Sequence, residues 1–148
     1  MPQPIIQVVR LDPYHEVWGP LVPMVALKLA KSLEDMPDLL HGVPVFMSAL
    51  WANNPDVLLL AAINPATGEV KGFCSAYIDG HILNIIQPRL DEPSENDAVS
   101  EMILHAQDWG RERKATLAVL VSKKLIDSRW TKKHNFRPSR HISVKELA

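Results

Sequence analysis

The chain has 148 residues, of which 47% are hydrophobic and 22% are charged, a balance typical of a soluble globular domain large enough for a real core. Its formal net charge of -1 gives no overall basic field, so a nucleic-acid partner is not expected. The single cysteine, Cys74, excludes an internal disulfide and a cysteine-cluster metal site, and no apolar run reaches the roughly 18 residues of a membrane span.

The N-terminal third predicts one strand followed by two helices. Residues 5–11 are rich in β-branched side chains and end at an Asp-Pro pair, a pattern typical of a strand. Residues 19–33 carry leucines and valines near one helical face, and their prolines fall in the first turn, where a proline is tolerated. Residues 35–40 begin a second helical segment, which we expect to break at residues 42–44 and to resume up to Trp51.

Three aromatic residues of this part, Tyr14, Trp18 and Trp51, have two possible roles. Exposed aromatic rings would mark an interface with a partner, whereas buried rings would belong to the core. We interpret them as core residues, because the surrounding helices need apolar side chains to cover a sheet.

The middle of the chain predicts antiparallel strands. Residues 57–63 are continuously apolar, as in a central strand. Residues 70–78 have the two-residue period of a strand, which places Val70 and Cys74 on one face and Phe73 on the other.

Asp79-Gly80 is a strong hairpin signal, so we expect residues 81–86 to return as a strand and residues 87–95 to form a polar loop. The C-terminal segments predict a helix, a strand, a helix and a strand, at about residues 96–113, 115–121, 122–133 and 136–147. The inward stripe expected for the first of these helices is Val99, Met102, Ile103, Ala106 and Gly110, with Trp109 on its flank. His105, Trp109 and Arg113 share one helical face, which we interpret as a packing flank.

The predicted order is strand, two helices, three strands, helix, strand, helix, strand. Helices on both faces of one mixed sheet would bury the apolar side chains of this order in layers, which predicts an α/β fold and a single domain over residues 1–148. The strand, helix and strand between residues 81 and 121 predict a parallel crossover unit.

Two segments carry a family resemblance. WGRERKATLAVLVS, residues 109–122, resembles a stretch common in GNAT-type N-acetyltransferases, in which a helix ends in WARERGA and a strand follows. RWTKKHNFRPSRHISVKEL, residues 129–147, resembles the LYEKLGFRP…VKEL ending of that family. The predicted element order is similar as well. The resemblance implies a GNAT-like fold with a central, mostly antiparallel sheet flanked by helices.

The resemblance also implies where acetyl-CoA binds in active members of the family. A glycine-rich loop before the crossover helix holds the pyrophosphate through backbone N–H groups. Here that loop falls on residues 94–99, and carboxylates crowd it; like charges about 4 Å apart cost roughly 1–4 kcal/mol near a surface. We therefore expect this helix end to cap itself. If the cofactor does bind, the resemblance assigns it to Ile85, Ile86, Asn96, Asp97, Ala98 and Val99.

The catalytic positions implied by the resemblance are atypical too. In active members a base, often a glutamate on the fourth strand, takes the proton of the substrate amine, and a tyrosine of the last helix protonates the departing thiolate. The fourth strand here has His81 and Asn84 and no carboxylate, and the tyrosine position falls on Thr131, a far weaker acid than a phenol. His81, Asn84 and Thr131 are the candidate catalytic residues, although a solvent-edge role explains His81 more simply.

Two functions remain open. The departures favour a GNAT-like domain without standard acetyl-CoA chemistry, which needs no cofactor and acts as a binding or structural module through protein partners or self-assembly. A weaker resemblance to acetyltransferase-like proteins of tailed bacteriophages makes a virion or assembly component one form of this hypothesis. The alternative is an active acetyl-CoA-dependent N-acetyltransferase with an atypical cofactor loop. The start of the chain lacks a signal-peptide pattern, so we expect a cytoplasmic protein, or a virion protein if a phage encodes it.

Overall fold

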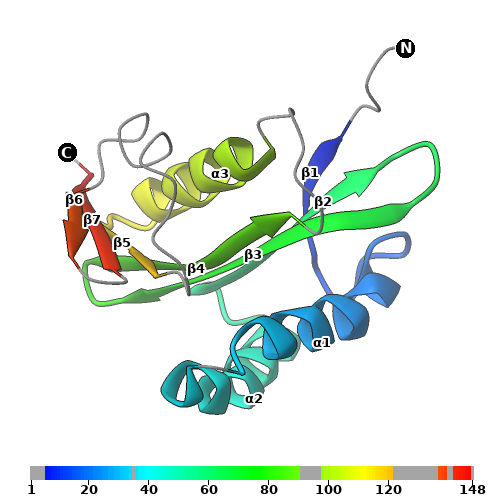
Figure 1. The fold of residues 1–148 in the computed structure, drawn as a ribbon, viewed down its shortest axis with the longest axis horizontal. Coiled ribbons are helices and arrows are strands. Elements are labelled where there is room, and N and C mark those ends of the chain that lie inside the picture. The colour runs from blue at the N-terminus through cyan, green and yellow to red at the C-terminus, as the bar shows by residue number, and fades with distance from the viewer. Residues whose placement is uncertain (1–5, 35, 91–97, 122–136, 140–141, 148) are drawn as a thin grey trace.

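The computed structural model describes residues 6–34, 36–90, 98–121, 137–139 and 142–147. The elements of this part of the chain (Figure 1) are, in order, β1 Gln7–Arg10, the 3-10 helix η1 Gly19–Leu21, α1 Val22–Ser32, α2 Pro37–Trp51, β2 Val57–Asn64, β3 Glu69–Asp79, β4 Ile82–Leu90, α3 Ala98–Glu112, β5 Leu117–Val121, β6 Arg137–Ser139 and β7 Ile142–Glu146.

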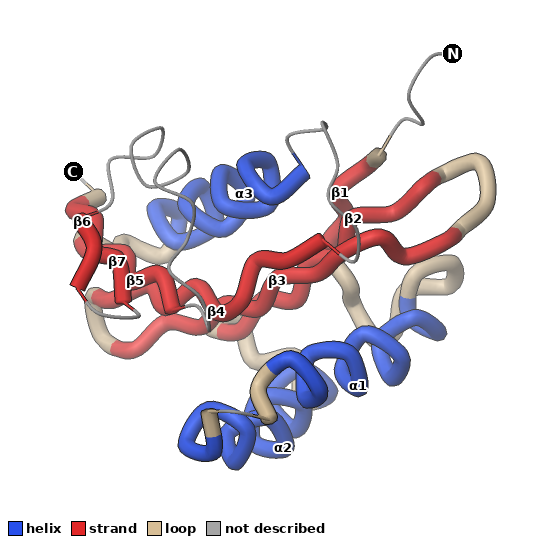
Figure 2. The backbone as a smooth tube through the Cα atoms, viewed as in Figure 1, coloured by secondary structure: helices blue, strands red, loops and turns tan. Residues whose placement is uncertain are grey.

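The strands form one mixed sheet (Figure 2). Within the described residues it has seven strands in the order β1-β2-β3-β4-β5-β7-β6. All neighbouring pairs are antiparallel except β4 and β5, which are parallel and are connected through α3. This arrangement confirms the predicted α/β fold, the mostly antiparallel sheet and the parallel crossover.

The helices divide between the two faces of the sheet (Figure 1). α3 covers one face, which we call the α3 face, and buries Met102, Ile103 and Ala106 completely. α1 and α2 cover the opposite face, the α1/α2 face, where Val25 and Leu29 are buried. Burial of these apolar side chains on both faces is the main favourable term in the folding of such a layered domain.

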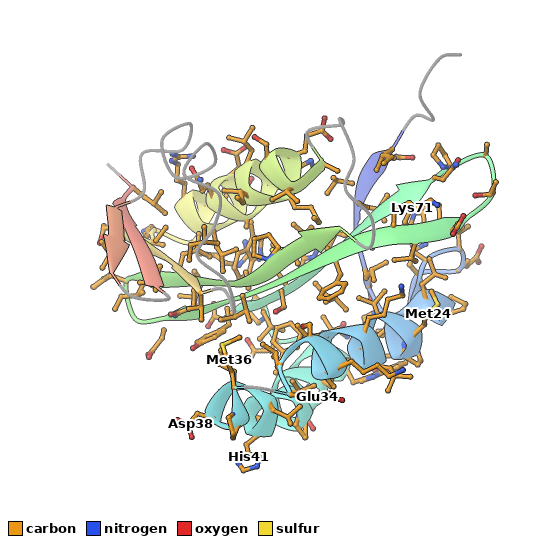
Figure 3. The ribbon with its side chains drawn as sticks, viewed as in Figure 1. Met24, Glu34, Met36, Asp38, His41 and Lys71 are labelled. Carbon is orange, nitrogen blue, oxygen red and sulfur yellow. The ribbon has the colours of Figure 1, made fainter. Side chains whose placement is uncertain are left out.

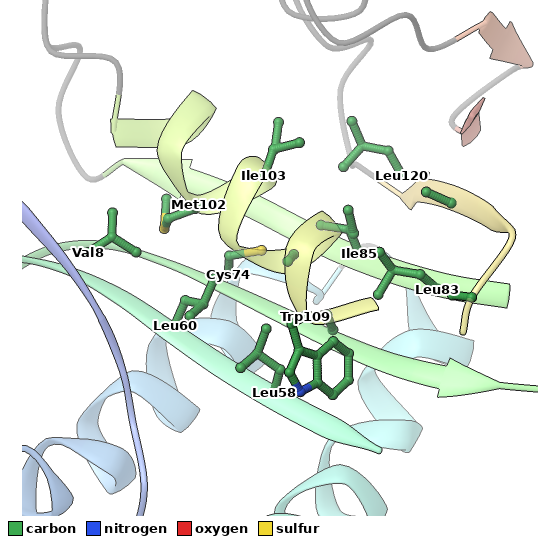
Figure 4. Close-up of a cluster of buried hydrophobic side chains, with 14 of the residues drawn as sticks. Val8, Leu58, Leu60, Cys74, Leu83, Ile85, Met102, Ile103, Trp109 and Leu120 are labelled. Atoms are coloured by element: carbon green, nitrogen blue, oxygen red, sulfur yellow. The ribbon is translucent and has the colours of Figure 1, made fainter. Parts of the chain in front are cut away.

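The α3 face is closely filled around Trp109 (Figure 4). Trp109 was predicted on the flank of the helix, but it is only 6% exposed and belongs to the core cluster with Leu58 and Leu83. The guanidinium of Arg113 lies 4.8 Å from the centroid of the Trp109 ring, whereas His105, on the same helical face, is exposed. A Cβ on Gly110 would come within 2.8 Å of Leu83 Cδ2, so glycine lets α3 lie close to β4.

The break predicted within the second helix is wrong. α2 runs without interruption from Pro37 to Trp51, with Pro44 in its interior. Pro44 lacks the N–H that would bond to the carbonyl of Leu40. Apolar side chains on both sides of Pro44, including Val43 and Phe46, pack against the same core cluster. These tertiary contacts hold one helix where the local sequence favours a break.

Irregularities in the strands change two further predictions. Ala62 pairs with Gly72 but Ile63 pairs with Val70, so β3 has one extra residue at this bulge. Val70 therefore packs in the α1/α2 cluster with Phe73 and not on the face of Cys74.

Two predicted strands also differ from the strands in the structure. β4 continues to Leu90, although a loop was expected from Gln87. The closing strand predicted at residues 136–147 is two antiparallel strands, β6 and β7, because Ser139 pairs with Ile142. The helix predicted at residues 122–133 lies outside the described residues.

Two of the three N-terminal aromatic residues are not in the core. Tyr14 is 60% exposed and Trp51 is 43% exposed, whereas Trp18 is partly buried. The rings of Tyr14 and Trp51 make an edge contact with 5.6 Å between centroids, and the Tyr14 hydroxyl donates a hydrogen bond to the carbonyl of Trp51. They join the end of α2 to the segment that follows β1, at the surface and not in the interior.

Candidate active site

A pocket of about 470 Å³ lies on the α1/α2 face, between the helices and strands β2, β3 and β4. It exists because α2 stands partly away from the sheet, so that Leu50 is its single fully buried residue. The volume is within the range of small-molecule sites, which are concave and mostly apolar. The side chains that form its apolar wall include Leu29, Leu33, Leu39, Val43, Phe46 and Ile86.

A few polar side chains interrupt this apolar wall. Ser75 on β3 is buried, and its hydroxyl donates a hydrogen bond of 3.5 Å to the carbonyl of Ile86. Tyr77, two residues further along β3, lies on the same face. Burial raises the pKa of Tyr77 above the ordinary 10.0, and the negative charge of Asp79 adds to the shift. The phenol therefore keeps its proton at neutral pH.

The two charged residues among the described lining are both carboxylates. Asp38 lies at the start of α2 (Figure 3), and Asp56 directly precedes β2. Asp56 is held by its backbone, because its N–H donates to Asn54 Oδ1 at 2.8 Å and its carbonyl accepts from the N–H of Ile78 at 2.9 Å. The next residue, Val57, pairs with Tyr77 on β3, so Asp56 lies one position beyond this pair.

β4 is irregular where it borders the pocket. Ser75 pairs with Ile86 but Phe73 pairs with Arg89, so β4 has one extra residue between these pairs. The pairing of β4 with β5 ends at Ile86 and Val121. From Gln87 to Leu90, β4 pairs with β3 alone within the described part of the chain. Among the described residues, the edge of β4 toward β5 therefore has no strand partner beyond Ile86, the residue that lines the pocket.

The structure separates the two candidate residues of the fourth strand. Asn84 lies on β4 opposite Tyr77 and Val119, partly buried, on the same face as Ile86. His81 is exposed in the hairpin turn and precedes the strand, because Gly80 takes a positive φ of 60° and makes the turn with it. At about 3.3 Å per residue, His81 is roughly 16 Å along the strand from Ile86, and it does not line the pocket.

The residues predicted to hold a cofactor fall into three groups. Ile86 lines the pocket, whereas Ile85 is fully buried on the α3 face, so a ligand at the β4 edge would meet only its backbone. Ala98 is buried in the α3-face cluster, and Val99 packs against that cluster while partly exposed. The other two cofactor candidates, Asn96 and Asp97, lie outside the described residues, and so does the catalytic candidate Thr131.

Other chemistry receives less support from the described residues. Cys74 is buried on the α3 face, and burial raises the pKa of its thiol far above 9.0, so it is not a thiolate nucleophile at neutral pH. Across the described ranges, no group of three or more His, Cys, Asp or Glu side chains is placed to hold a metal ion. None of the helices described is both long enough and apolar enough to cross a membrane.

Tyr77, Asp38 and Asp56 line the pocket, although they were not predicted as site residues. The alternation of β3 already placed Tyr77 on the face of Ser75, but nothing in that pattern indicated a pocket. Asp38 lies at the start of α2 and Asp56 lies beyond its end, and only the position of α2 over the sheet brings both residues to one cavity.

Several solved structures resemble this fold at low sequence identity. A GNAT-family acetyltransferase from Staphylococcus aureus Mu50 has a TM-score of 0.69 and 12% identity, over 97% of this chain and 100% of its own. The PaiA N-acetyltransferase of Thermoplasma acidophilum, in complex with coenzyme A, has a TM-score of 0.61 and 14% identity, over 96% and 99% of the two chains. The GNAT-family N-acetyltransferase YhbS of Escherichia coli, in complex with CoA, has a TM-score of 0.61 and 16% identity, over 100% and 84%.

No protein-family model and no curated protein sequence matches the chain. Identities of this size establish the fold and leave the activity open.

Proposed function

Starting from the GNAT acetyltransferase fold, we propose that this chain acts in the cytoplasm as an acyl-CoA-dependent N-acyltransferase. The acyl donor binds along the unpaired edge of β4, and the acceptor amine binds in the pocket under α2. The observation that carries the proposal is that Ile86 lines the pocket and also ends the pairing of β4 with β5. The two CoA complexes among the similar structures support a donor of this class.

The residues around β4 suit such a donor. An unpaired strand edge presents backbone N–H and carbonyl groups, which are the partners that the amide groups of a pantetheine arm need. Ile86 would contact the arm through its side chain, and Ile85 through its backbone. The N-terminal residues of α3, Ala98 and Val99, lie at the end of a helix dipole that favours negative charge, as in a phosphate, although the carboxylate of Glu101 in the same first turn opposes it. The bound donor supplies a thioester-activated acyl group.

The polar residues of the pocket face perform the remaining tasks. Asn84 lies on the same face of β4 as Ile86 but is not among the described residues that line the pocket, and its amide is a donor and an acceptor that can orient the amine where the pocket borders β4. Tyr77 is protonated at neutral pH, as any tyrosine is, and its raised pKa makes it a weaker acid, so its hydroxyl can donate a hydrogen bond there. The apolar walls exclude water from the amine, which strengthens these interactions.

Acetyl-CoA binding tests the proposal. Calorimetry and thermal shift are expected to show binding, and a ligand at 100 times its dissociation constant adds about 2.7 kcal/mol to stability. Acyl transfer from acetyl-CoA is expected to fall in Asn84→Ala and to remain unchanged in His81→Ala, the matched variant on the same hairpin. The proposal is wrong if millimolar acetyl-CoA neither binds nor shifts the unfolding temperature.

A specific observation favours a second function, that of a binding or structural module. Between Ile82 and Ile86, β4 carries no ionisable side chain that could act as a base. Tyr14, Val45 and Trp51 are exposed on the segments of the α1/α2 face, where a protein partner or a second copy would cover apolar surface. A virion or assembly component is one form of this function. A chain that is monomeric in light scattering, enters no particle and acetylates amines would exclude it.

A further inference from the structure

The pocket on the α1/α2 face has walls that favour one kind of acceptor. Apolar atoms surround it from Leu29 of α1 and from Leu33 directly after that helix, from Val43 and Phe46 of α2, and from Ile86 of β4. Such walls gain free energy by removing the apolar surface of a ligand from water. They offer few hydrogen bonds, so a ligand rich in hydroxyl or amino groups would lose solvation without recovering it.

The charge of the lining is of one sign. Asp38 and Asp56 are carboxylates, and no lysine, arginine or histidine is found among the described residues that line the pocket. Asp56 is fixed by the hydrogen bonds of its backbone, next to the position of Tyr77 on β3. Both carboxylates are exposed, so they attract a positively charged ligand and repel an anion of the same shape only weakly. They attract a polycation at least as strongly as a monocation, and the preference for a monoamine therefore comes from the apolar walls.

From these two observations we propose that the pocket selects a monoamine with an apolar body, such as an arylalkylamine, over polyamines and over anions. The ammonium group binds at Asp56, and the apolar body lies between α1, α2 and β4. This inference rests on the proposed function, because it assigns the acceptor class of the same site.

The structure also offers a way to close the pocket without disturbing the fold. Gly42 lines the pocket in the middle of α2, and a Cβ built on it meets no atom within 4 Å. Its φ is not in the left-handed region, so a larger side chain is compatible with the helix. Gly42→Leu therefore adds bulk at the pocket and favours the helix, whereas Gly42→Ala favours the helix with little added bulk.

The test measures direct binding by calorimetry in the absence of any CoA, with 2-phenylethylamine, 3-phenylpropionate, ethylamine and spermidine as probes. We expect 2-phenylethylamine to bind best and each of the others about tenfold or more weakly. Asp56→Asn is expected to weaken the binding of 2-phenylethylamine by about tenfold. Asp108 is an exposed carboxylate on α3, and Asp108→Asn is expected to leave this binding unchanged. Gly42→Leu is expected to abolish this binding and Gly42→Ala to retain it, with thermal unfolding confirming that both variants fold.

Equal binding of 3-phenylpropionate, or unchanged binding in Gly42→Leu, overturns the inference. Acetyl transfer to spermidine but not to 2-phenylethylamine would also overturn it and would leave the proposed function standing. Binding of 2-phenylethylamine without any binding of acetyl-CoA has the opposite meaning: the pocket specificity stands and the acyltransferase proposal falls.

Discussion

The two long helices of this protein lie on opposite faces of the sheet and differ in how far they are buried. α3 and α2 each have 15 residues, but eight residues of α3 are fully buried and only Leu50 of α2 is. Nevertheless α2 has the more apolar sequence. A helix with apolar residues on most of its surface is normally covered by its surroundings. Both faces have a buried core cluster, but α3 is covered more completely than α2, so the α1/α2 face keeps uncovered apolar surface for a ligand or a partner.

The largest expected effect is on the α3 face. Ile103→Ala removes a completely buried side chain from the closely packed cluster, and we expect a loss of about 2–5 kcal/mol in the free energy of unfolding. Leu27→Ala on α1, where the leucine is 58% exposed, is the matched variant and should change stability by less than about 0.5 kcal/mol. Urea unfolding measures both. Similar losses for the two variants would contradict the buried position of Ile103 and the exposed position of Leu27.

The next effect, a gain, is expected on α2. Pro44→Ala restores an N–H in the helix interior and should raise the free energy of unfolding by about 2 kcal/mol. The gain is smaller than the full helix preference of alanine, because proline also restricts the unfolded chain. Thermal and urea unfolding check the sign. A loss of stability would mean that the ring of Pro44 makes packing contacts worth more than the missing hydrogen bond.

A third difference between the faces concerns pH. Cys74 keeps its proton in the folded protein above pH 9.0, where an unfolded thiol begins to lose it. The contribution of this protonated thiol to the free energy of unfolding is therefore complete below about pH 9. It declines as the pH rises further, by up to about 1.4 kcal/mol per pH unit. Urea unfolding between pH 8 and 10.5 should show a shallower decline for Cys74→Ala than for the unchanged protein. Equal slopes would contradict the buried, protonated thiol. Tyr77, at the pocket, is partly exposed, and its raised pKa acts in the same direction with a weaker effect.

The smallest expected effect is at the surface of the α1/α2 side. Tyr14→Phe removes the hydroxyl that donates to the carbonyl of Trp51 but keeps the edge contact of the two rings. We expect a loss of about 0.5–1 kcal/mol, because an exposed hydrogen bond is largely replaced by water. Differential scanning calorimetry measures it, and a loss above about 2 kcal/mol would indicate that this surface is more rigidly coupled to α2 than its exposure suggests.

Much of the fold followed from local patterns. The apolar run of β2, the Asp79-Gly80 turn and the helical period of α3 each depend on residues that are close in the sequence, and all three are confirmed. The parallel pairing of β4 with β5 is confirmed as well. In contrast, the continuity of α2 through Pro44 depends on packing against the sheet, which no local pattern reveals.

The site was predicted less well than the fold. Asn84 was identified and lies on the pocket face, whereas His81 was placed one position too far into the strand and sits in the turn. Tyr77 was assigned to the correct face without a role. The bulge in β4 was not predicted, since an extra residue in a strand leaves no mark on a pattern of alternating side chains.

By itself the sequence determined the order of the elements, the apolar faces of the strands and the absence of a carboxylate between residues 81 and 86, because these depend on residue type and on short spacings. Only the tertiary structure decided how α2 packs over the sheet and that residues as distant as Asp38 and Ile86 line one pocket. The physical reason is that a cavity depends on how whole elements pack, and packing joins residues that no periodicity connects.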